Sequence, residues 1–444
     1  MTETVLKTEE PEKRVIEMPT ADYWDMEAPL LDAADIPLEE INMMNPRYFA
    51  EDKIWDYFER LRNEDPVHFN EMEWSGRFWS LTRYEDIVEL DKDHRNFSSA
   101  HGIGLGLPID AKLPDDVLSP SEMGMFIAMD EPKHAKQRKT VSPIVAPASL
   151  QILESTIRER AAKILDSLPI GEEIDWVDLV SIELTTQMLA TLFDFPFEDR
   201  RKLTRWSDVT TTVPGAGLID SEEQRKQELL ECLTAFSQLW QERKENPGHD
   251  LISMLVHGEE TKNMVQEDPL EFLGNLLLLI VGGNDTTRNS ISGGVVGLNK
   301  FPEQYQKLRE DVSLIPNMVS EVIRWQTPLP YMRRTANQDC MIRDKQIKAG
   351  DQVIMWYVSG NRDPERFENP NDFIIDRPNA RQHVSFGFGI HRCMGNRLAE
   401  MQLRILWEEM MQRFHFVEIV GEPERTMSSF IKGYTKLPVI VHAK

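Results

Sequence analysis

The stretch LLLLIVGGNDTTRNS, from Leu276 to Ser290, restricts the possible folds of this chain more than any other feature. Asp268 and Pro269 form an N-cap and first-turn signal, and no second helix breaker occurs before Phe301-Pro302. These limits predict one helix of about 30 residues, roughly 45 Å long. Its centre is apolar on every face and is therefore expected to be buried. A helix of this length can cross a whole domain.

Polar residues interrupt this apolar helix in its middle. Gly282 and Gly283 each weaken it by about 1 kcal/mol relative to alanine. Asp285 and Thr286 add polar groups that need partners when buried. Helix packing accounts for the glycines, and Thr286 can bond back to a carbonyl one turn earlier. Packing does not account for the aspartate, so the interruption needs a functional explanation as well.

Helical periodicity dominates most of the sequence. Apolar residues return every three or four positions in residues 48–66 and 150–168. The clearest strand signals lie between Cys340 and Ser359, where short β-prone runs separated by turn residues predict a small antiparallel sheet. No linker rich in Pro, Gly or Ser divides the chain. We therefore expect a mainly α fold with a small β-sheet region, as a single domain over residues 46–444, preceded by an acidic, extended or partly ordered arm over residues 1–45.

The charge and the cysteines narrow the class of protein. The net charge of −25, from 75 acidic and 50 basic residues, argues against nucleic acid and anionic membranes as partners. Cys232, Cys340 and Cys393 lie far apart without a CxxC pair, which argues against a disulfide framework. The N-terminus is polar and acid-rich, and no apolar run approaches the roughly 18 residues of a membrane span. We expect a cytoplasmic protein without a membrane anchor.

Cys393 lies between a glycine-rich loop and a strong helix pattern, in HVSFGFGIHRCMGNRLAEMQLRILWEEM. Ala399, Leu403, Leu406 and Met410 recur at helical spacing, so a helix begins at or just after the cysteine. Unpaired amide groups at a helix N-terminus stabilise a thiolate. This placement predicts a lowered pKa for the Cys393 thiol.

Two ordinary interpretations of Cys393 compete with a functional one. A lone cysteine in a cytosolic protein is often a buried structural residue. A zinc site formed with His383 and His391 is a second alternative, but it lacks a fourth ligand at any usual spacing. Against both stands the segment FGFGIHRCMG, from Phe386 to Gly395, which matches the pattern Phe-Gly-x-Gly-x-His-x-Cys-x-Gly at every fixed position. It resembles the heme-ligand loop of the cytochromes P450, and the resemblance implies that Cys393 is the axial thiolate ligand of a heme iron.

Other motifs extend this resemblance over nearly everything from Pro46 to the C-terminus. EVIR contains Glu321 and Arg324 one helical turn apart, as in the family's Glu-x-x-Arg pair, and FIIDRP supplies Arg377 as the third member of that charged triad. GGNDTT matches the family's acid-alcohol signature, and all motifs occur in the family's order. The resemblance implies the triangular, mostly helical cytochrome P450 fold, heme b as cofactor, monooxygenase activity with O2, and a structural role for the triad.

The resemblance also assigns roles to residues around the heme. Asp285 and Thr286 become catalytic residues that deliver protons during oxygen activation. A buried heme propionate needs a cation or a hydrogen-bond donor. The expected heme-binding residues are His134, Arg138, Arg334 and His391 at the propionates, with Gly282, Gly283 and Phe386 elsewhere around the heme. For Arg333, which precedes Arg334, we favour an ordinary surface charge.

The positions that the resemblance places at the substrate pocket are uncharged, and nearly all are apolar. They are Leu278, Val281, Gly282, Leu329, Pro330 and Phe430. The glycine-rich loop from Ser98 to Pro108 is expected to be a mobile cover over the entrance. GGNDTTRNSISGG, MRRTA, WYVSGNRDP and HVSFGFGIHRCMGNRLAE together are similar to the soluble bacterial alkane-hydroxylase group, which implies terminal hydroxylation of medium-chain alkanes or related aliphatic compounds. Terpenes, aryl alkanes and fatty acids stay open as alternatives.

Electron supply is expected from separate proteins. Soluble bacterial members of the family take electrons from NAD(P)H through a ferredoxin reductase and a ferredoxin, and no flavin or ferredoxin domain is evident here. Since ferredoxins are usually acidic, we expect a monomer with a basic patch near Cys393 that includes Lys133, Lys136, Arg392 and Arg397. A peroxide-driven hydroxylase is one rival, but such enzymes commonly lack the acid-alcohol pair. A non-catalytic heme sensor or storage protein, the second rival, would need no proton relay.

Overall fold

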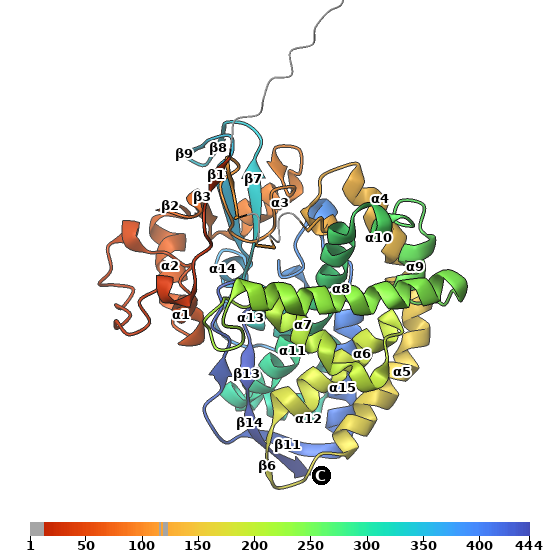
Figure 1. Ribbon diagram of the computed structural model, residues 1–444. Coiled ribbons are helices and arrows are strands. Elements are labelled where there is room, and N and C mark those ends of the chain that lie inside the picture. Colours follow the sequence, from red (N-terminus) through yellow and green to blue (C-terminus); the bar gives the residue numbers. More distant parts are fainter. Residues whose placement is uncertain (1–12, 115–116, 119–122) are drawn as a thin grey trace, which may run out of the picture.

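The computed structural model describes residues 13–114, 117–118 and 123–444. The predicted long helix is present as α11 (Pro269–Lys300), which runs through the helical part of the molecule (Figure 1). The Asp268 side chain accepts a hydrogen bond from the Glu271 amide at 3.0 Å and caps the first turn. The helix ends at Lys300, and its C-cap residue Phe301 directly precedes Pro302. Both predicted limits of the helix are confirmed.

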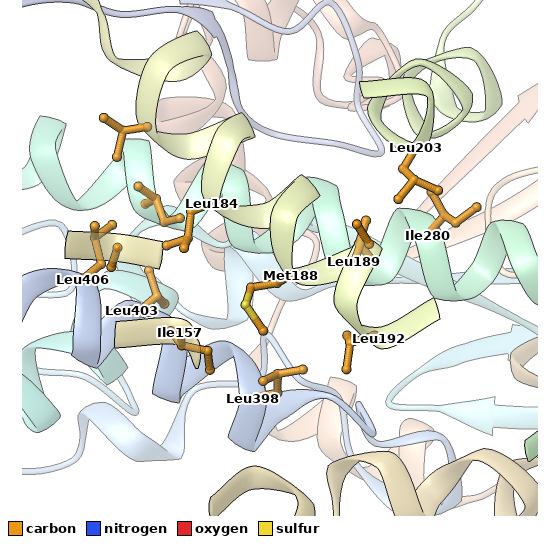
Figure 2. Close-up of a cluster of buried hydrophobic side chains, with 14 of the residues drawn as sticks. Ile157, Leu184, Met188, Leu189, Leu192, Leu203, Ile280, Leu398, Leu403 and Leu406 are labelled. Carbon is orange, nitrogen blue, oxygen red and sulfur yellow. The ribbon is translucent and has the colours of Figure 1, made fainter. Parts of the chain in front are cut away.

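Helices packed around α11 bury much of the apolar surface. α11 contacts α6 (Glu183–Phe193), α7 (Arg201–Thr211), α8 (Glu222–Glu245), α13 (Ile315–Gln326) and α15 (Asn396–Arg413), and α15 also packs against α5 (Pro147–Asp166). Figure 2 shows part of this core, where Met188 of α6 lies among side chains that include Ile157, Ile280 and Leu403. The mainly α fold class is confirmed.

Shorter helices complete the α part of the described chain. They are α1 (Pro46–Ala50), α2 (Ile54–Glu64), α3 (Tyr84–Lys92), α4 (Lys133–Val141), α9 (Leu251–His257), α10 (Met264–Glu267), α12 (Pro302–Glu310) and α14 (Tyr357–Gly360). The helical periodicity of residues 48–66 and 150–168 thus corresponds to helices in the structure. Within the described residues, no helix combines the length and the apolar character needed to cross a membrane.

A five-stranded mixed sheet gathers strands from distant parts of the sequence (Figure 1). Its order is β2 (Val67–Met72), β3 (Gly76–Leu81), β10 (Gln352–Trp356), β7 (Tyr331–Ala336) and β4 (Phe97–Ser98). β10 runs parallel to β3 and antiparallel to β7, with Gln352 opposite Thr335. The sheet therefore brings the segment after α13 next to the loop that follows β4.

The prediction of one antiparallel sheet between Cys340 and Ser359 is partly wrong. β8 (Cys340–Ile342) and β9 (Lys345–Ile347) form a separate antiparallel hairpin, and the segment that follows β10 is the helix α14. Every residue of β10 is buried, whereas most of the hairpin is at least partly exposed. A strand that is buried on both faces needs neighbours and cover that a short local hairpin cannot provide, so β10 joins the larger sheet.

The ends of the chain lie in smaller sheets. β11 (Phe414–Ile419), β14 (Pro438–Ala443) and β6 (Glu173–Asp175) form one sheet, and β12 (Glu424–Arg425) pairs with β13 (Tyr434–Lys436). Near the N-terminus, β1 (Arg14–Val15) pairs with β5 (Ala111–Lys112), and Ile41, Met43 and Met44 are buried. Residues 1–12 of the predicted acidic arm lie outside the described residues. The division into an arm and a single domain stays a prediction.

Candidate functional site

A cavity of about 760 Å³ lies between α11, α15 and the loop that carries Cys393. The predicted site residues that line it are Arg138, Leu278, Val281, Gly282, Gly283, Thr286, Leu329, Arg334, Phe386, His391, Cys393 and Phe430. Of the residues predicted to act in catalysis or to contact the heme or the substrate, three are not among those that line it: His134, Asp285 and Pro330. Pro330 is buried between the lining residues Leu329 and Tyr331 and accepts a backbone hydrogen bond from the Val358 amide at 3.0 Å. Its place in the substrate pocket stays a prediction.

The centre of α11 borders this cavity. Leu278, Leu279 and Val281 are only half-buried, which corrects the prediction that the apolar centre is buried on every face. Leu276 and Ile280 of the same stretch are both 0% exposed, do not line the cavity and face the protein core. The helix therefore presents one apolar side to the core and another to the cavity.

The loop before α15 presents Cys393 at the cavity wall. The Cys393 amide donates to the Phe386 carbonyl at 2.8 Å, and α15 begins at Asn396, as predicted. Gly387 and Gly389 have φ values of 65° and 66°, a left-handed conformation that glycine adopts without strain. At Gly389 a Cβ atom would also lie 2.7 Å from the Asp91 carbonyl oxygen. The glycines thus fold the loop tightly enough to bring the sulfur to the cavity.

The prediction of a lowered Cys393 pKa is wrong for the polypeptide alone. Burial raises the pKa of the Cys393 thiol, because the surrounding protein disfavours the thiolate. The backbone amides of Gly395 and Asn396 and the charges of Arg138 and Arg392 oppose this effect without reversing it. The thiolate therefore needs a bound cation for full stabilisation, which a ferric or ferrous iron would provide.

The polar groups beside Cys393 fit the carboxylates of a heme. His134 and His391 have ring centroids 4.2 Å apart, and the His134 Nε2 and both ring nitrogens of His391 are buried without a hydrogen-bond partner among the described residues. Burial lowers the pKa of both histidines, that of His391 to about 2, so both are neutral. His391 can therefore donate one N–H into the cavity, whereas His134 Nδ1 lies 3.3 Å from Glu131 Oε1. Arg138 and Arg334 line the cavity nearby. Two cations and unpaired donors at one end of the cavity are what two propionates require.

Arg334 and the cysteine loop share a partner that sequence analysis missed. Asp91 on α3 accepts a hydrogen bond from Arg334 Nη2 at 2.7 Å, from the Tyr357 hydroxyl at 3.0 Å and from the Phe388 amide at 2.7 Å. Asp91 is 2% exposed. It orients Arg334 and holds the loop at the same time. No motif marks Asp91 in the sequence, because its three partners come from later segments of the chain.

Gly282 and Gly283 have different environments. A Cβ atom on Gly282 would meet no heavy atom within 4 Å, whereas one on Gly283 would lie 2.7 Å from Leu189 Cδ2 of α6. The Thr286 hydroxyl donates to the Gly282 carbonyl at 3.1 Å, as the packing explanation expected. Gly282 and Thr286 therefore leave open space on the cavity side of α11, while Gly283 permits close helix packing.

Asp285 points away from the cavity toward α7. It is fully buried and accepts hydrogen bonds from Ser207 Oγ at 3.0 Å, from Asn284 Nδ2 at 3.0 Å and from Arg288 Nη2 at 2.9 Å. Burial raises the pKa of Asp285 to about 6, although the Arg288 charge opposes this. Arg288 also contacts Asp208 at 2.8 Å, whose side chain is 28% exposed. Asp285 is thus linked to the surface through charged groups.

The predicted triad is closed and buried. Glu321 Oε1 and Oε2 each lie 2.7 Å from Arg324, in a bidentate pair, and both lie 3.1 Å from Arg377 Nε. Arg324 also donates to the carbonyls of Asn361, Pro370 and Asp372. The triad therefore fixes the irregular segment that precedes the cysteine loop, in agreement with the structural role expected for it.

The expected basic patch is weaker than predicted. Lys133 forms an ion pair with Glu271, and Lys136 pairs with Glu260 at 3.2 Å. Arg392 and Arg397 are exposed and have no ion pair within the described part of the chain. The sequence could not reveal that Glu271 lies next to Lys133, because 138 residues separate them. Of the four residues predicted for the patch, only Arg392 and Arg397 lack an ion pair among the described residues.

The loop that follows β4 is not free of the sheet. Arg333, expected at the surface, is 1% exposed and donates from its backbone amide to the Ile103 carbonyl at 2.7 Å. The Leu105 amide donates to the Tyr331 hydroxyl at 3.2 Å. The predicted surface position of Arg333 is therefore wrong, whereas the mobility expected of this loop stays a prediction. A zinc site gains no support, since the described residues contain no group of three His, Cys, Asp or Glu side chains that could hold a metal ion.

Comparisons with known proteins agree with this geometry. Residues 113–438 match the sequence model of the cytochrome P450 family. The solved structure of cytochrome P450-153 from Novosphingobium aromaticivorans is 46% identical, covers 90% of this chain and 99% of its own, and superposes with a TM-score of 0.82. Linalool 8-monooxygenase from Pseudomonas putida is 35% identical over 92% of this chain and its entire own length. A methyl-branched lipid omega-hydroxylase from Mycobacterium tuberculosis is 31% identical over 91% of this chain and 95% of its own.

A helical fold with a thiol, two glycines and a polar helix interruption around one cavity defines a heme-thiolate oxygenase. The chain belongs to the cytochrome P450 family. It is a cytochrome P450 monooxygenase, which uses heme and O2, receives electrons from external redox partners and acts on an apolar substrate.

Proposed function

We propose that this monooxygenase hydroxylates the terminal carbon of medium-chain alkanes or related aliphatic compounds. The observation that carries the proposal is the apolar wall opposite Cys393, where Leu278, Val281, Leu329 and Phe430 line the cavity without a charged side chain among them. An elongated hydrocarbon can be bound there only through apolar contacts. The similarity to cytochrome P450-153 supports this assignment.

Cys393 is proposed as the axial ligand of the heme iron. His134, Arg138, Arg334 and His391 would hold the propionates by charge and N–H donation. When bound, the heme supplies the iron at which O2 is activated, and a thiolate ligand favours cleavage of the O–O bond. Gly282, Gly283 and Phe386 are proposed to flank the heme, with Gly282 leaving the open space above it.

Asp285 and Thr286 are proposed to move protons. Asp208 and Arg288 connect Asp285 to solvent, and a carboxyl whose pKa is about 6 can both take up and release a proton near neutral pH. The Thr286 hydroxyl lies at the cavity wall, where it can hold a water molecule or pass on a proton. Because Asp285 itself does not line the cavity, the two residues act in succession, Asp285 on the solvent side and Thr286 on the substrate side.

Electrons are proposed to come from NAD(P)H through a ferredoxin reductase and an acidic ferredoxin. Arg392 and Arg397 are exposed, have no ion pair among the described residues and would contact such a partner. The enzyme is proposed to work as a monomer in the cytoplasm.

A terpene hydroxylase is the second candidate function, favoured by the similarity to linalool 8-monooxygenase. The test is a set of substrate-induced difference spectra with medium-chain alkanes, fatty acids, aryl alkanes and linalool, followed by product analysis. The expected result is tightest binding and terminal hydroxylation for the alkanes. Preferred binding of linalool with hydroxylation of that compound would overturn the alkane assignment.

The ligand assignment is tested separately. Reduced protein under carbon monoxide should show the red-shifted Soret absorption of a thiolate-ligated heme, and Cys393→Ala should lose it. If the alanine variant kept this band, Cys393 would not be the ligand.

A further inference from the structure

Arg333 is a buried cation in the wall of the cavity. It lies on β7, and its side chain is 1% exposed. Successive side chains of a strand point to opposite faces, so Arg333 points away from the face of Arg334 and shares the face of Tyr331. Its Nε donates to the Gly102 carbonyl at 3.2 Å, and its Nη1 donates to Gln352 Oε1. The guanidinium therefore joins the sheet to the loop of residues 102–106, which also lines the cavity.

Gln352 of β10 holds the other end of the same loop. Its Nε2 donates to the Gly106 carbonyl at 2.8 Å and to the Ser75 carbonyl at 2.7 Å, and its Oε1 accepts from the Gly106 amide at 3.1 Å. Together with the bond from the Leu105 amide to the Tyr331 hydroxyl, these bonds satisfy backbone groups that have no partner within regular secondary structure. The loop is thus attached to the sheet at Gly102, Leu105 and Gly106.

The glycines of this loop permit the close approach of the guanidinium. A Cβ atom on Gly102 would lie 2.7 Å from Arg333 Nη2, and Gly102 has a φ of +105°. A Cβ atom on Gly106 would lie 3.1 Å from Arg333 Nη1. These contacts give both glycines a packing role, which differs from the flexibility expected of a glycine-rich loop.

The charge of Arg333 is not neutralised by a carboxylate. Among the described residues no ion pair involves it, and its charged or titratable neighbours are Arg334, Tyr331 and His101. Burial lowers the pKa of Arg333 to about 10, which leaves it charged at neutral pH. A buried charge is screened much less than a surface charge, so its field extends into the cavity.

We propose that Arg333 is a specificity-determining residue, which holds residues 102–106 as a fixed wall of the substrate cavity and whose unpaired charge disfavours substrates with a cationic head group. Neutral and anionic head groups are admitted at the same position. The inference rests on the proposed use of this cavity for an elongated apolar substrate. It adds a selection by charge that the apolar wall opposite Cys393 cannot make.

The first test measures how firmly the loop is held. Hydrogen exchange of the peptide that covers residues 102–107 is followed by mass spectrometry in the heme-loaded protein. In Arg333→Gln and Arg333→Lys the amide hydrogens of this peptide should exchange at least about tenfold faster. Neither side chain has the planar guanidinium with which arginine donates to the Gly102 carbonyl and to Gln352 Oε1 at the same time. Arg77→Gln is the matched control, since Arg77 lies in the same sheet with a side chain that is 46% exposed. Unchanged exchange in Arg333→Gln overturns the positioning role.

The second test measures selection by charge with ligands of equal chain length. Decane, decanoate and decyltrimethylammonium are titrated by difference spectra, and the quaternary ammonium has no lone pair that could bind iron. In the unaltered protein the ammonium compound should bind at least about tenfold more weakly than decane. Arg333→Gln should remove this difference, and Arg333→Lys should keep it. If Arg333→Gln and the unaltered protein rank the three ligands in the same order, the Arg333 charge does not select against cationic head groups.

A second variant covers the case in which Arg333→Gln does not fold. Gln352→Leu removes the acceptor of Arg333 and the anchor of Gly106 without changing any charge, so it should speed exchange and leave the ranking of ligands unchanged. Loss of the carbon monoxide band, or failure of decane to bind the unaltered protein, would refute the proposed function instead. The two failures are therefore distinguishable.

Discussion

Replacing Glu321 by glutamine tests how much the charge of the triad contributes to stability, because only one carboxylate oxygen is exchanged for an amide nitrogen. The Glu321 carboxylate is fully buried and lies between two arginines, Arg324 at 0% and Arg377 at 2% exposure. It also accepts a hydrogen bond from the Ile374 amide at 2.9 Å. Glutamine retains the size and one acceptor oxygen but no charge. The variant therefore leaves both guanidinium groups without a counterion in the protein interior.

The loss of stability in Glu321→Gln follows from the burial of the two arginines that lose their counterion. Breaking a buried ion pair by removing one partner costs about 3–5 kcal/mol, because the remaining charge stays desolvated. An ordinary domain unfolds with a free energy of about 5–15 kcal/mol, so this one substitution removes a large fraction of the stability. The effect should be concentrated on the segment from Asn361 to Asp372, whose carbonyls the arginines hold.

The measurement is urea unfolding followed by circular dichroism, with the heme content determined in parallel. Glu154→Gln is the matched control, because Glu154 pairs with Arg404 at 2.8 Å on the surface, with side chains that are 39% and 28% exposed. This exposed pair should cost at most about 1 kcal/mol. Loss of less than about 1 kcal/mol in Glu321→Gln would refute the argument that the triad works as a buried charge network.

Three further substitutions test α11 or a segment packed against it. Thr286→Ala should leave substrate binding intact but divert electrons to hydrogen peroxide, measured as peroxide per NAD(P)H consumed; fully coupled turnover would exclude Thr286 from proton delivery. The raised pKa of Asp285 means that the folded protein holds a proton that the unfolded chain has lost, so its stability falls as pH rises from about 4 to 6; Asp285→Asn should flatten this fall in urea midpoints, and an unchanged slope would contradict it. In Gly433→Ala the new Cβ would lie 2.0 Å from Asn289 Oδ1, so we expect a loss of about 1–3 kcal/mol and a weaker substrate-induced spectral shift, and unchanged unfolding would oppose this.

The limits of the helices α11 and α15 could be predicted, because they depend on residues that are close together in the sequence. The cap at Asp268, the breaker at Pro302 and the apolar run between them were sufficient to define α11. The start of α15 after Cys393 follows from helical spacing in the same way. These features need no information from distant segments, because hydrogen bonds within a helix join residues four positions apart.

Features that depend on distant partners could not be predicted. Arg333 and Arg334 are adjacent in the sequence, but their side chains leave opposite faces of β7 and meet different partners, Gln352 for the first and Asp91 for the second. Asp285 and Thr286 were assigned one shared role, yet their directions on α11 differ, so that Ser207 of α7 binds only the aspartate. The sign of the Cys393 pKa shift depended in the same way on the protein that the completed fold gathers around the sulfur, although the residue stays open to the cavity.

The glycine pair in α11 has a consequence for engineering. Within the polypeptide, a Cβ atom on Gly282 would meet no heavy atom within 4 Å, so a methyl group there would take volume from the cavity that the heme and the substrate are proposed to share. The same group on Gly283 would press on Leu189 and increase the distance between α6 and α11. Two adjacent positions thus control separate quantities, one the room for substrate and the other the spacing of two core helices. Cavity size in this enzyme is adjustable at position 282 at little risk to the fold, and position 283 is not a substitute for it.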